Sequence, residues 1–330
     1  MSRLTLATLL GVILLASVLA GVRFGSVELT TAEVLAALTS GEVEMHRDIV
    51  LQLRLPRTLL GVLVGGGLAL AGATFQALLR NPLAEPYILG ISGGASVGAV
   101  AVIALGWAGF GTWSLPLATF AGALLAIMLV FRVATATGRA MDVRVLLLAG
   151  VVVAAFFSAC IAFILSISSA LTVQRVVLWS MGSLARASWQ SVLVAAVYTL
   201  PAAVVLIGLA RPLNLMAIGE ETAHYLGADV EGVKRTALVI AALITAAGVA
   251  VAGVIGFVGL VVPHAIRLLI GSDHRALLPL SFLGGAAFLT LADLIARLAL
   301  DPIEIPIGVI TAFVGVPIFL VLLRRSLAGT

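Results

Sequence analysis

Long apolar stretches, separated by short groups of charged residues, make up most of this chain. A helix needs about 20 apolar residues to cross a membrane, so most of these stretches predict one spanning helix each. The pattern as a whole therefore predicts an all-α bundle of transmembrane helices. The stretches without Asp, Glu, Lys or Arg are residues 4–22, 58–79, 86–131, 145–174, 187–210, 236–266, 276–292 and 305–323.

Two of the stretches predict more than one helix. Residues 86–131 are interrupted at 106–113, a glycine-rich turn with two tryptophans of the kind that favour a membrane interface. Residues 236–266 continue past Arg267 and contain four glycines, which favours one full span followed by a short one. The prediction is about ten spans in the chain.

Composition excludes the soluble alternatives. Of the 330 residues, 62% are apolar and only 10% are charged, whereas about a quarter of an average soluble domain is charged. So few charges cannot cover the surface of a soluble enzyme. A transmembrane β-barrel would show short alternating segments in place of unbroken apolar runs.

The distribution of Lys and Arg predicts the orientation. If the N-terminus is cytoplasmic and the sides alternate, 12 of these residues lie inside and 7 outside, as the positive-inside rule favours. We therefore expect a multi-pass protein of the cell (inner) membrane with both termini in the cytoplasm. Residues 1–330 would form a single transmembrane domain with an outer loop at 23–56 and a cytoplasmic loop at 211–235. In the outer loop, Thr30 and Glu33 have the spacing of a helix capping box.

The motifs of common enzyme chemistry do not occur in the sequence. Gly65–Gly67 lies inside a span and lacks the Gly-Lys-Ser/Thr that completes a nucleotide-binding loop. No H-E-x-x-H or C-x-x-C occurs, so we expect no catalytic residue, no metal site and no nucleic-acid partner. The histidines, predicted to be surface or interfacial residues, are His46, His224, His264 and His274.

Asp293 is the acidic residue flanked by apolar sequence on both sides. Arg297 follows it by four residues, one helical turn away, which predicts a local ion pair. A proton relay is not evident, and this argues against an ion-coupled secondary transporter. That class stays the alternative, because broken helices can bind Na⁺ through backbone carbonyls.

Small residues and prolines predict where helices pack closely and where they break. Gly61 and Gly65, like Gly94 and Gly98, have the small-x-x-x-small spacing that lets helices approach. The prolines at 82 and 86 would end the preceding helix ahead of a glycine-rich helix start at 90–94.

The cytoplasmic loop carries apolar and acidic residues in alternation over 214–231. Gly219 and Gly227 punctuate it, so it predicts two short amphipathic helices with a tight turn. Its acidic charge would be repelled by anionic lipid, which attracts basic helices. Another protein is the better partner for this loop.

Several ordered segments together resemble the permease subunits of ABC importers for iron-siderophore, haem and cobalamin. The resemblance covers residues 4–324. The segments that carry it are 53–58, 72–84, 86–95, 179–183, 219–227, 256–267, 273–275, 292–293 and 306–311.

The resemblance implies a type II ABC importer permease of ten helices per subunit that works as a homodimer. Two ATP-binding cassette subunits would dock on the cytoplasmic side and bind ATP and Mg, so this chain would hold no cofactor. A periplasmic or lipoprotein binding protein would deliver the cargo from outside. Iron-siderophore is favoured as the commonest cargo of the family, with cobalamin or haem as the other candidates.

The resemblance also implies roles for particular residues. The loop that fits the ATPase would include Gly219, Glu220, Glu221, Ala223, Leu226 and Gly227. Binding-protein docking would fall to Arg54, Arg57 and Arg297. The cytoplasmic gate region would include Asn81, Pro82, Leu83, Asp142, Val143 and Arg144.

Overall fold

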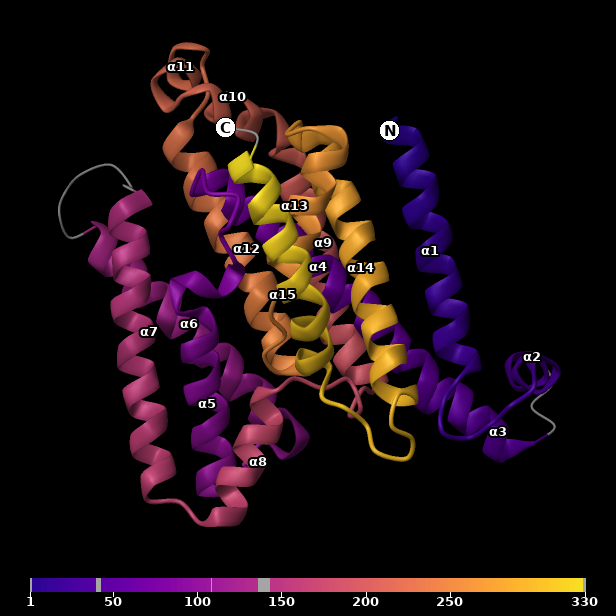
Figure 1. Ribbon diagram of the computed structural model, residues 1–330. Helices are drawn as coiled ribbons and strands as arrows, with labels where there is room; N and C mark the ends of the chain where they lie inside the picture. The colour runs from indigo at the N-terminus through magenta and orange to yellow at the C-terminus, as the bar shows by residue number, and fades with distance from the viewer. Residues whose placement is uncertain (1, 40–42, 108, 136–142, 329–330) are drawn as a thin grey trace.

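The computed structural model describes residues 2–39, 43–107, 109–135 and 143–328. Within these ranges every regular element is helical, and the tall helices stand side by side (Figure 1). The predicted all-α, multi-span architecture is confirmed.

Seven helices in the described ranges are long and apolar enough to cross a membrane. They are α1 (Arg3–Arg23), α4 (Leu55–Leu78), α6 (Ser114–Thr135), α7 (Val143–Ser166), α9 (Trp189–Gly208), α12 (Val230–Ala252) and α14 (His274–Leu298). Three further apolar helices are α5 (Ile91–Leu105), α13 (Val258–Ile270) and α15 (Ile307–Ala328). The ten helices fall on the stretches that the sequence pattern predicts.

Short helices gather at the two ends of the bundle. The α11 end carries α10 (Ala210–Ile218) and α11 (Glu220–Tyr225), together with the start of α1 (Figure 1). The opposite α2 end carries α2 (Thr31–Thr39), α3 (Glu44–Asp48) and α8 (Ala170–Ser180). The remaining elements are η1 (Ile49–Arg54), which runs into α4, η2 (Pro86–Leu89) and η3 (Gly111–Trp113).

The predicted capping box at the start of α2 is present. The Thr30 amide donates to a Glu33 carboxylate oxygen at 2.6 Å, and the Glu33 amide donates to the Thr30 hydroxyl at 3.3 Å. The hydrogen bond from the Thr30 amide is the main cause of a lowered pKa of Glu33, because it favours the ionised carboxylate. The reciprocal pair fixes where this outer helix begins.

Helix α4 is the centre of the bundle, and most of its residues are buried. Gly65 meets Gly285 of α14 so closely that a Cβ at either would collide with the backbone carbonyl of the other. At Gly61 a Cβ would make only ordinary contacts, the nearest with Leu184 Cδ1 at 3.4 Å and the others with Thr290. The close approach therefore depends on Gly65 within the predicted pair.

Helices α5 and α6 pack by the same device. A Cβ at Gly94 would collide with the carbonyl of Gly122, and one at Gly98 with the carbonyl of Ala118. Both glycines of this predicted pair are therefore required for the contact.

The chain unwinds twice inside the bundle. After α4 it passes Pro82 and Pro86 to Gly90, whose φ of 72° allows α5 to begin at the next residue, as predicted. Between α12 and α13, residues 253–257 are not helical, and Phe257 has a φ of 68°. These two breaks lie next to each other, since Glu85 and Tyr87 of the first are hydrogen-bonded to backbone groups of the second.

The prediction for two of the histidines is wrong. His264 on α13 and His274 at the start of α14 are buried, not interfacial. Helix α14 packs on α13 and α1, and Asn214 of α10 accepts from the backbone amide of His274 at 2.9 Å. Tertiary packing covers residues that their position near span ends had placed at the surface.

Candidate functional site

The α10–α11 hairpin forms the outermost part of the α11 end (Figure 1). Gly219 joins the two helices with a φ of 152°, and Gly227 follows α11 with a φ of 82°. Both are backbone conformations that favour glycine. The two short helices and the tight turn match the amphipathic pattern of the sequence.

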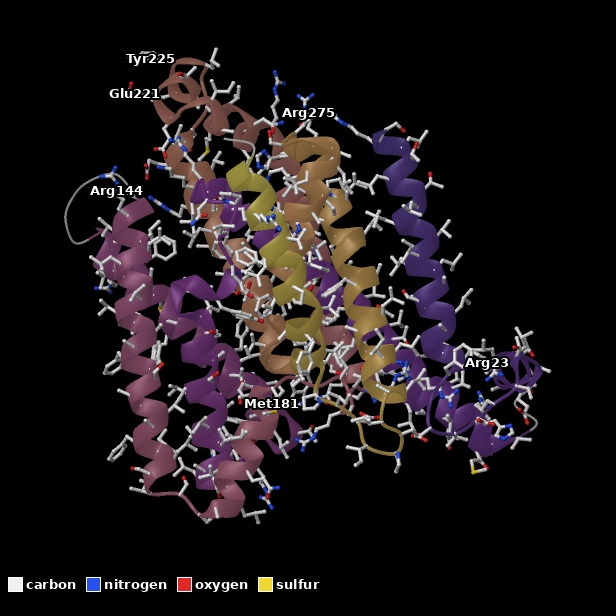
Figure 2. The ribbon with its side chains drawn as sticks, viewed as in Figure 1. Arg23, Arg144, Met181, Glu221, Tyr225 and Arg275 are labelled. Carbon is white, nitrogen blue, oxygen red and sulfur yellow. The ribbon has the colours of Figure 1, made fainter. Side chains whose placement is uncertain are left out.

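The exposed surface of this hairpin is both apolar and acidic. Tyr225 is 87% exposed, Ile218 and Leu226 are also exposed, and Glu221 lies beside them. Figure 2 shows Glu221 and Tyr225 at the extreme end of the molecule. We call these four residues the α11 tip. Exposed apolar side chains with a charged neighbour are typical of a protein-docking surface.

Two residues predicted for the same surface are less exposed. Ala223 is fully buried under the hairpin. Glu220 lies 2.5 Å from Lys234 Nζ and 3.4 Å from an Arg80 guanidinium nitrogen. The sequence missed both basic partners. Glu220 therefore anchors the hairpin to α12 and to the end of α4.

The predicted gate segment 81–83 directly follows α4. The Leu83 amide donates to Asn81 Oδ1 at 2.9 Å, and Pro82 is exposed. Arg144, near the start of α7, is exposed at the same end of the molecule (Figure 2). Val143 is the first residue of α7, and Asp142 lies outside the described residues. The gating role of these residues stays a prediction.

The α2 end brings together arginines from distant parts of the chain. The Arg57 guanidinium contacts Asp293 at 2.9 Å through one nitrogen and Glu304 at 2.8 Å through another. Arg297 contacts the same Asp293 at 3.3 Å. The predicted Asp293–Arg297 ion pair is present, and the sequence missed the contacts of Arg57 with Asp293 and with Glu304.

Two of the three arginines expected to meet a binding protein are buried. Arg54 is 5% and Arg297 6% exposed. Arg54 donates to the backbone carbonyls of Val22, Arg23 and Val27. Arg297 donates to those of Gly21 and Phe24. In this conformation both arginines stabilise the end of α1 and the loop that follows it. Arg57 and its partner Glu304 lie nearer the surface. Docking by these arginines stays a prediction.

A cavity of about 590 Å³ opens beside the unwound segment 253–257. It lies between the end of α8, that segment and the first part of α15. The lining residues, all in the described part of the chain, carry no formal charge. They are Ser180, Met181, Val254, Gly256, Phe257, Gly308, Val309, Ala312, Phe313, Val316 and Pro317.

Polar side chains from the first break hold the second break in place. Glu85 accepts a hydrogen bond from the Phe257 amide at 2.8 Å. The Tyr87 hydroxyl donates to the Ile255 carbonyl at 3.0 Å. No sequence pattern singled out either residue, although Glu85 lies directly before Pro86, at the start of the charge-free stretch 86–131. That position was the signal that could have found it.

Long apolar helices, an uncharged cavity and an exposed apolar and acidic hairpin at one end are the features expected of a membrane permease subunit. Residues 13–325 match the model of the FecCD transport family, and the chain belongs to this family.

Curated relatives and a solved structure agree with this assignment. The chain is 45% identical to the cobalamin import system permease protein of Halobacterium salinarum, over 88% of this chain and 77% of that one. It is 42% identical to the hemin transport system permease protein of Yersinia pestis, over 84% of each. It superposes on an inward-facing metal-chelate type ABC transporter with a TM-score of 0.87 and 30% identity, covering 98% of this chain and 100% of that one.

The chain is therefore a multi-pass permease subunit of an ABC importer, a class that works with ATPase and binding-protein partners. This confirms the family that the sequence motifs resemble. It also sets aside the ion-coupled carrier and confirms that the chain is a transporter subunit and not itself an enzyme.

Proposed function

We propose that this chain carries a bulky metal chelate of the iron-siderophore, cobalamin or haem type into the cytoplasm. Two separate ATPase subunits, which bind ATP and Mg, would supply the energy. The observation that carries the proposal is the uncharged lining of the cavity. A free metal ion would need charged or carbonyl ligands to replace its water, whereas a chelate presents its organic surface to the wall.

The comparisons support the chelate class without choosing one member. The cobalamin and hemin permeases are almost equally similar to this chain, at 45% and 42% identity. Iron-siderophore stays the favoured cargo on the argument of frequency in the family.

The cargo is tested with the permease, its ATPase and its binding protein reconstituted together in vesicles. We expect ATP-dependent uptake of a ferric siderophore, cobalamin or haem, and none of unchelated Fe³⁺. Uptake of unchelated Fe³⁺ alone would overturn the proposal. Vesicles that hold the permease without an ATPase serve as the control and should import nothing.

A second copy of the chain would close the cavity. Phe313 lines the cavity and is 74% exposed, and Val316 beside it is exposed as well. Exposed apolar side chains at the mouth of a cavity suit a symmetric partner face. We therefore propose a homodimer with the transport pathway between the two α15 helices.

Cysteine cross-linking tests this dimer. Cys160 is the single native cysteine, so Phe313→Cys is placed in a Cys160→Ser background. We expect an oxidised dimer in membranes. Leu15→Cys is the matched control, because Leu15 is exposed on α1, away from α15 in Figure 1. Equal cross-linking of both variants, or of neither, would contradict the proposed face.

The α11 end would face the cytoplasm, with the chain termini on the same side. The α11 tip would enter the ATPase, and the α2 end would meet the binding protein. Glu221→Arg should abolish ATPase binding, because it reverses the charge of an exposed acidic group in the tip. Pull-down of the ATPase with the detergent-solubilised permease measures this. Retention of the ATPase at wild-type level would remove the tip from the interface.

A further inference from the structure

We infer that residues 80–87, the link segment between α4 and α5, transmit movement of the α10–α11 hairpin to the wall of the cavity. Arg80 ties the segment to the hairpin, and Glu85 and Tyr87 tie it to the unwound stretch 253–257. The inference rests on the proposed function and adds to it the residues that couple ATPase docking to the pathway.

The first end of the link segment contacts both helices of the hairpin. Arg80 lies 3.4 Å from Glu220 of α11 and donates to the Met216 carbonyl of α10 at 3.2 Å. Glu220 is held from the other side by Lys234. A displacement of the hairpin therefore reaches Arg80 through two contacts.

The backbone at Arg80 is in a sparsely populated conformation. Its φ is 47°, in the left-handed region that is unfavourable for a non-glycine residue. Such a conformation persists only where surrounding contacts hold it. Arg80 is also the residue where the chain leaves α4, so a change in its contacts alters the direction of the link segment.

The middle of the segment is braced against α13 by a buried amide. Gln76 Nε2 donates to the Ala84 carbonyl at 3.3 Å and to the Gly259 carbonyl at 3.2 Å. Arg267 of α13 donates to Gln76 Oε1 at 2.8 Å. The link segment cannot shift without changing its contacts to the start of α13.

The far end of the segment holds the wall of the cavity. Residues 253–257 are not helical, so their backbone groups need partners from elsewhere in the low-dielectric interior. Glu85 accepts from the Phe257 amide. The Tyr87 hydroxyl both donates to the Ile255 carbonyl and accepts from the Ile255 amide, at 3.0 and 3.2 Å. Because Val254, Gly256 and Phe257 line the cavity, the link segment determines the position of this wall.

These contacts form a continuous path from the hairpin to the cavity. Continuity alone is not coupling, which has to be measured as a free energy between the two sites. The informative quantity is the number of cargo molecules imported per ATP hydrolysed, because a merely structural defect lowers both rates with the amount of folded complex.

The first experiment uses Arg80→Gln in the reconstituted complex. We expect the ATPase to stay bound and the cargo imported per ATP to fall about tenfold, the size of a typical coupling energy. Arg275→Gln, an exposed arginine at the same end, is the matched control and should keep the wild-type ratio. In an Arg80→Gln/Glu220→Gln double variant the loss should be smaller than the two single losses combined, since both substitutions remove the Arg80–Glu220 contact.

The second experiment acts at the other end. Glu85→Ala should lower the ratio, while Glu85→Gln, which keeps an oxygen acceptor for the Phe257 amide, should restore most of it. An unchanged ratio in both Arg80→Gln and Glu85→Ala overturns the link. Loss of ATPase binding in Arg80→Gln also overturns it, because Arg80 would then serve docking. If the wild-type complex imports no chelate with ATP, the proposed function fails instead.

Discussion

The two ends of the molecule each hold a carboxylate between two basic groups, but at different depths. At the α11 end Glu220 lies between Arg80 and Lys234, and its side chain is 35% exposed. At the α2 end Asp293 lies between Arg57 and Arg297, and its side chain is 4% exposed. The Glu220 cluster is therefore partly exposed through Glu220 and Arg80, although its Lys234 side chain is only 5% exposed, and the Asp293 cluster is buried.

The difference in burial assigns the two clusters different tasks. Removing one member of a buried cluster leaves uncompensated charge and costs about 3–5 kcal/mol. An exposed ion pair, such as that between Arg80 and Glu220, contributes only about 0–1 kcal/mol to stability. Such a pair can break and re-form during a conformational change. The Asp293 cluster fixes α4 against α14 as a rigid platform, and the Glu220 cluster lies where movement would enter the permease.

The largest effect is expected at Asp293. Asp293→Ala should destabilise the permease by about 3–5 kcal/mol, because Arg57 and Arg297 lose their shared partner. Thermal unfolding of the detergent-solubilised protein measures this. The exposed Asp48→Asn is the control and should unfold like the wild type. Equal stability of Asp293→Ala and the wild type would mean that the buried cluster holds nothing together.

The scaffold between the two ends is tested at Gly65. Gly65→Ala should cost about 1–3 kcal/mol, because its Cβ collides with the backbone of Gly285 and forces α4 from α14. Gly61→Ala, one turn earlier, should be close to neutral, since its Cβ makes only ordinary contacts. The same unfolding assay compares the two. Equal stability of the two variants would contradict the close-packing role of Gly65, because helix propensity alone favours Ala over Gly at both positions.

The α11 tip should affect binding and not stability. Tyr225→Ala should leave unfolding unchanged and weaken ATPase affinity by about 1–2 kcal/mol, because large exposed aromatic side chains contribute strongly to docking. Surface-binding measurements with the purified ATPase check this. Leu4→Ala is a suitable control, as Leu4 is exposed on α1 outside the tip. An affinity equal to the wild type would exclude Tyr225 from the interface.

The smallest of these effects is expected at Glu304. Its side chain is 44% exposed, so Glu304→Gln should change stability by less than about 1 kcal/mol. The variant frees one side of the Arg57 guanidinium, and we expect tighter docking of an acidic binding protein, most clearly at low salt. Titration of the binding protein at two salt concentrations measures it. Weaker docking would mean that Glu304 itself contacts the partner.

The sequence predicted one contact of the Asp293 cluster and none of the Glu220 cluster, for one reason. The Asp293–Arg297 pair was predictable because the residues lie one helical turn apart. Arg57 reaches Asp293 across 236 residues and Glu304 across 247, and no local pattern encodes such a contact. The contacts of Glu220 with Arg80 and Lys234 were missed in the same way, since the packing of the hairpin against the chain after α4 and against α12 is a tertiary feature.

The sequence by itself determined the class of protein, the number and position of the apolar helices, the short-helix hairpin and the glycines that let helices approach. These features follow from hydrophobicity, periodicity and local geometry, which act over a few residues. Only the tertiary structure decided which charged groups are exposed and which are buried, because burial depends on what the rest of the chain places around each side chain. Arg54 and Glu221 illustrate this: both are charged loop or helix-end residues in the sequence, yet the first is buried among backbone carbonyls and the second is exposed at the tip.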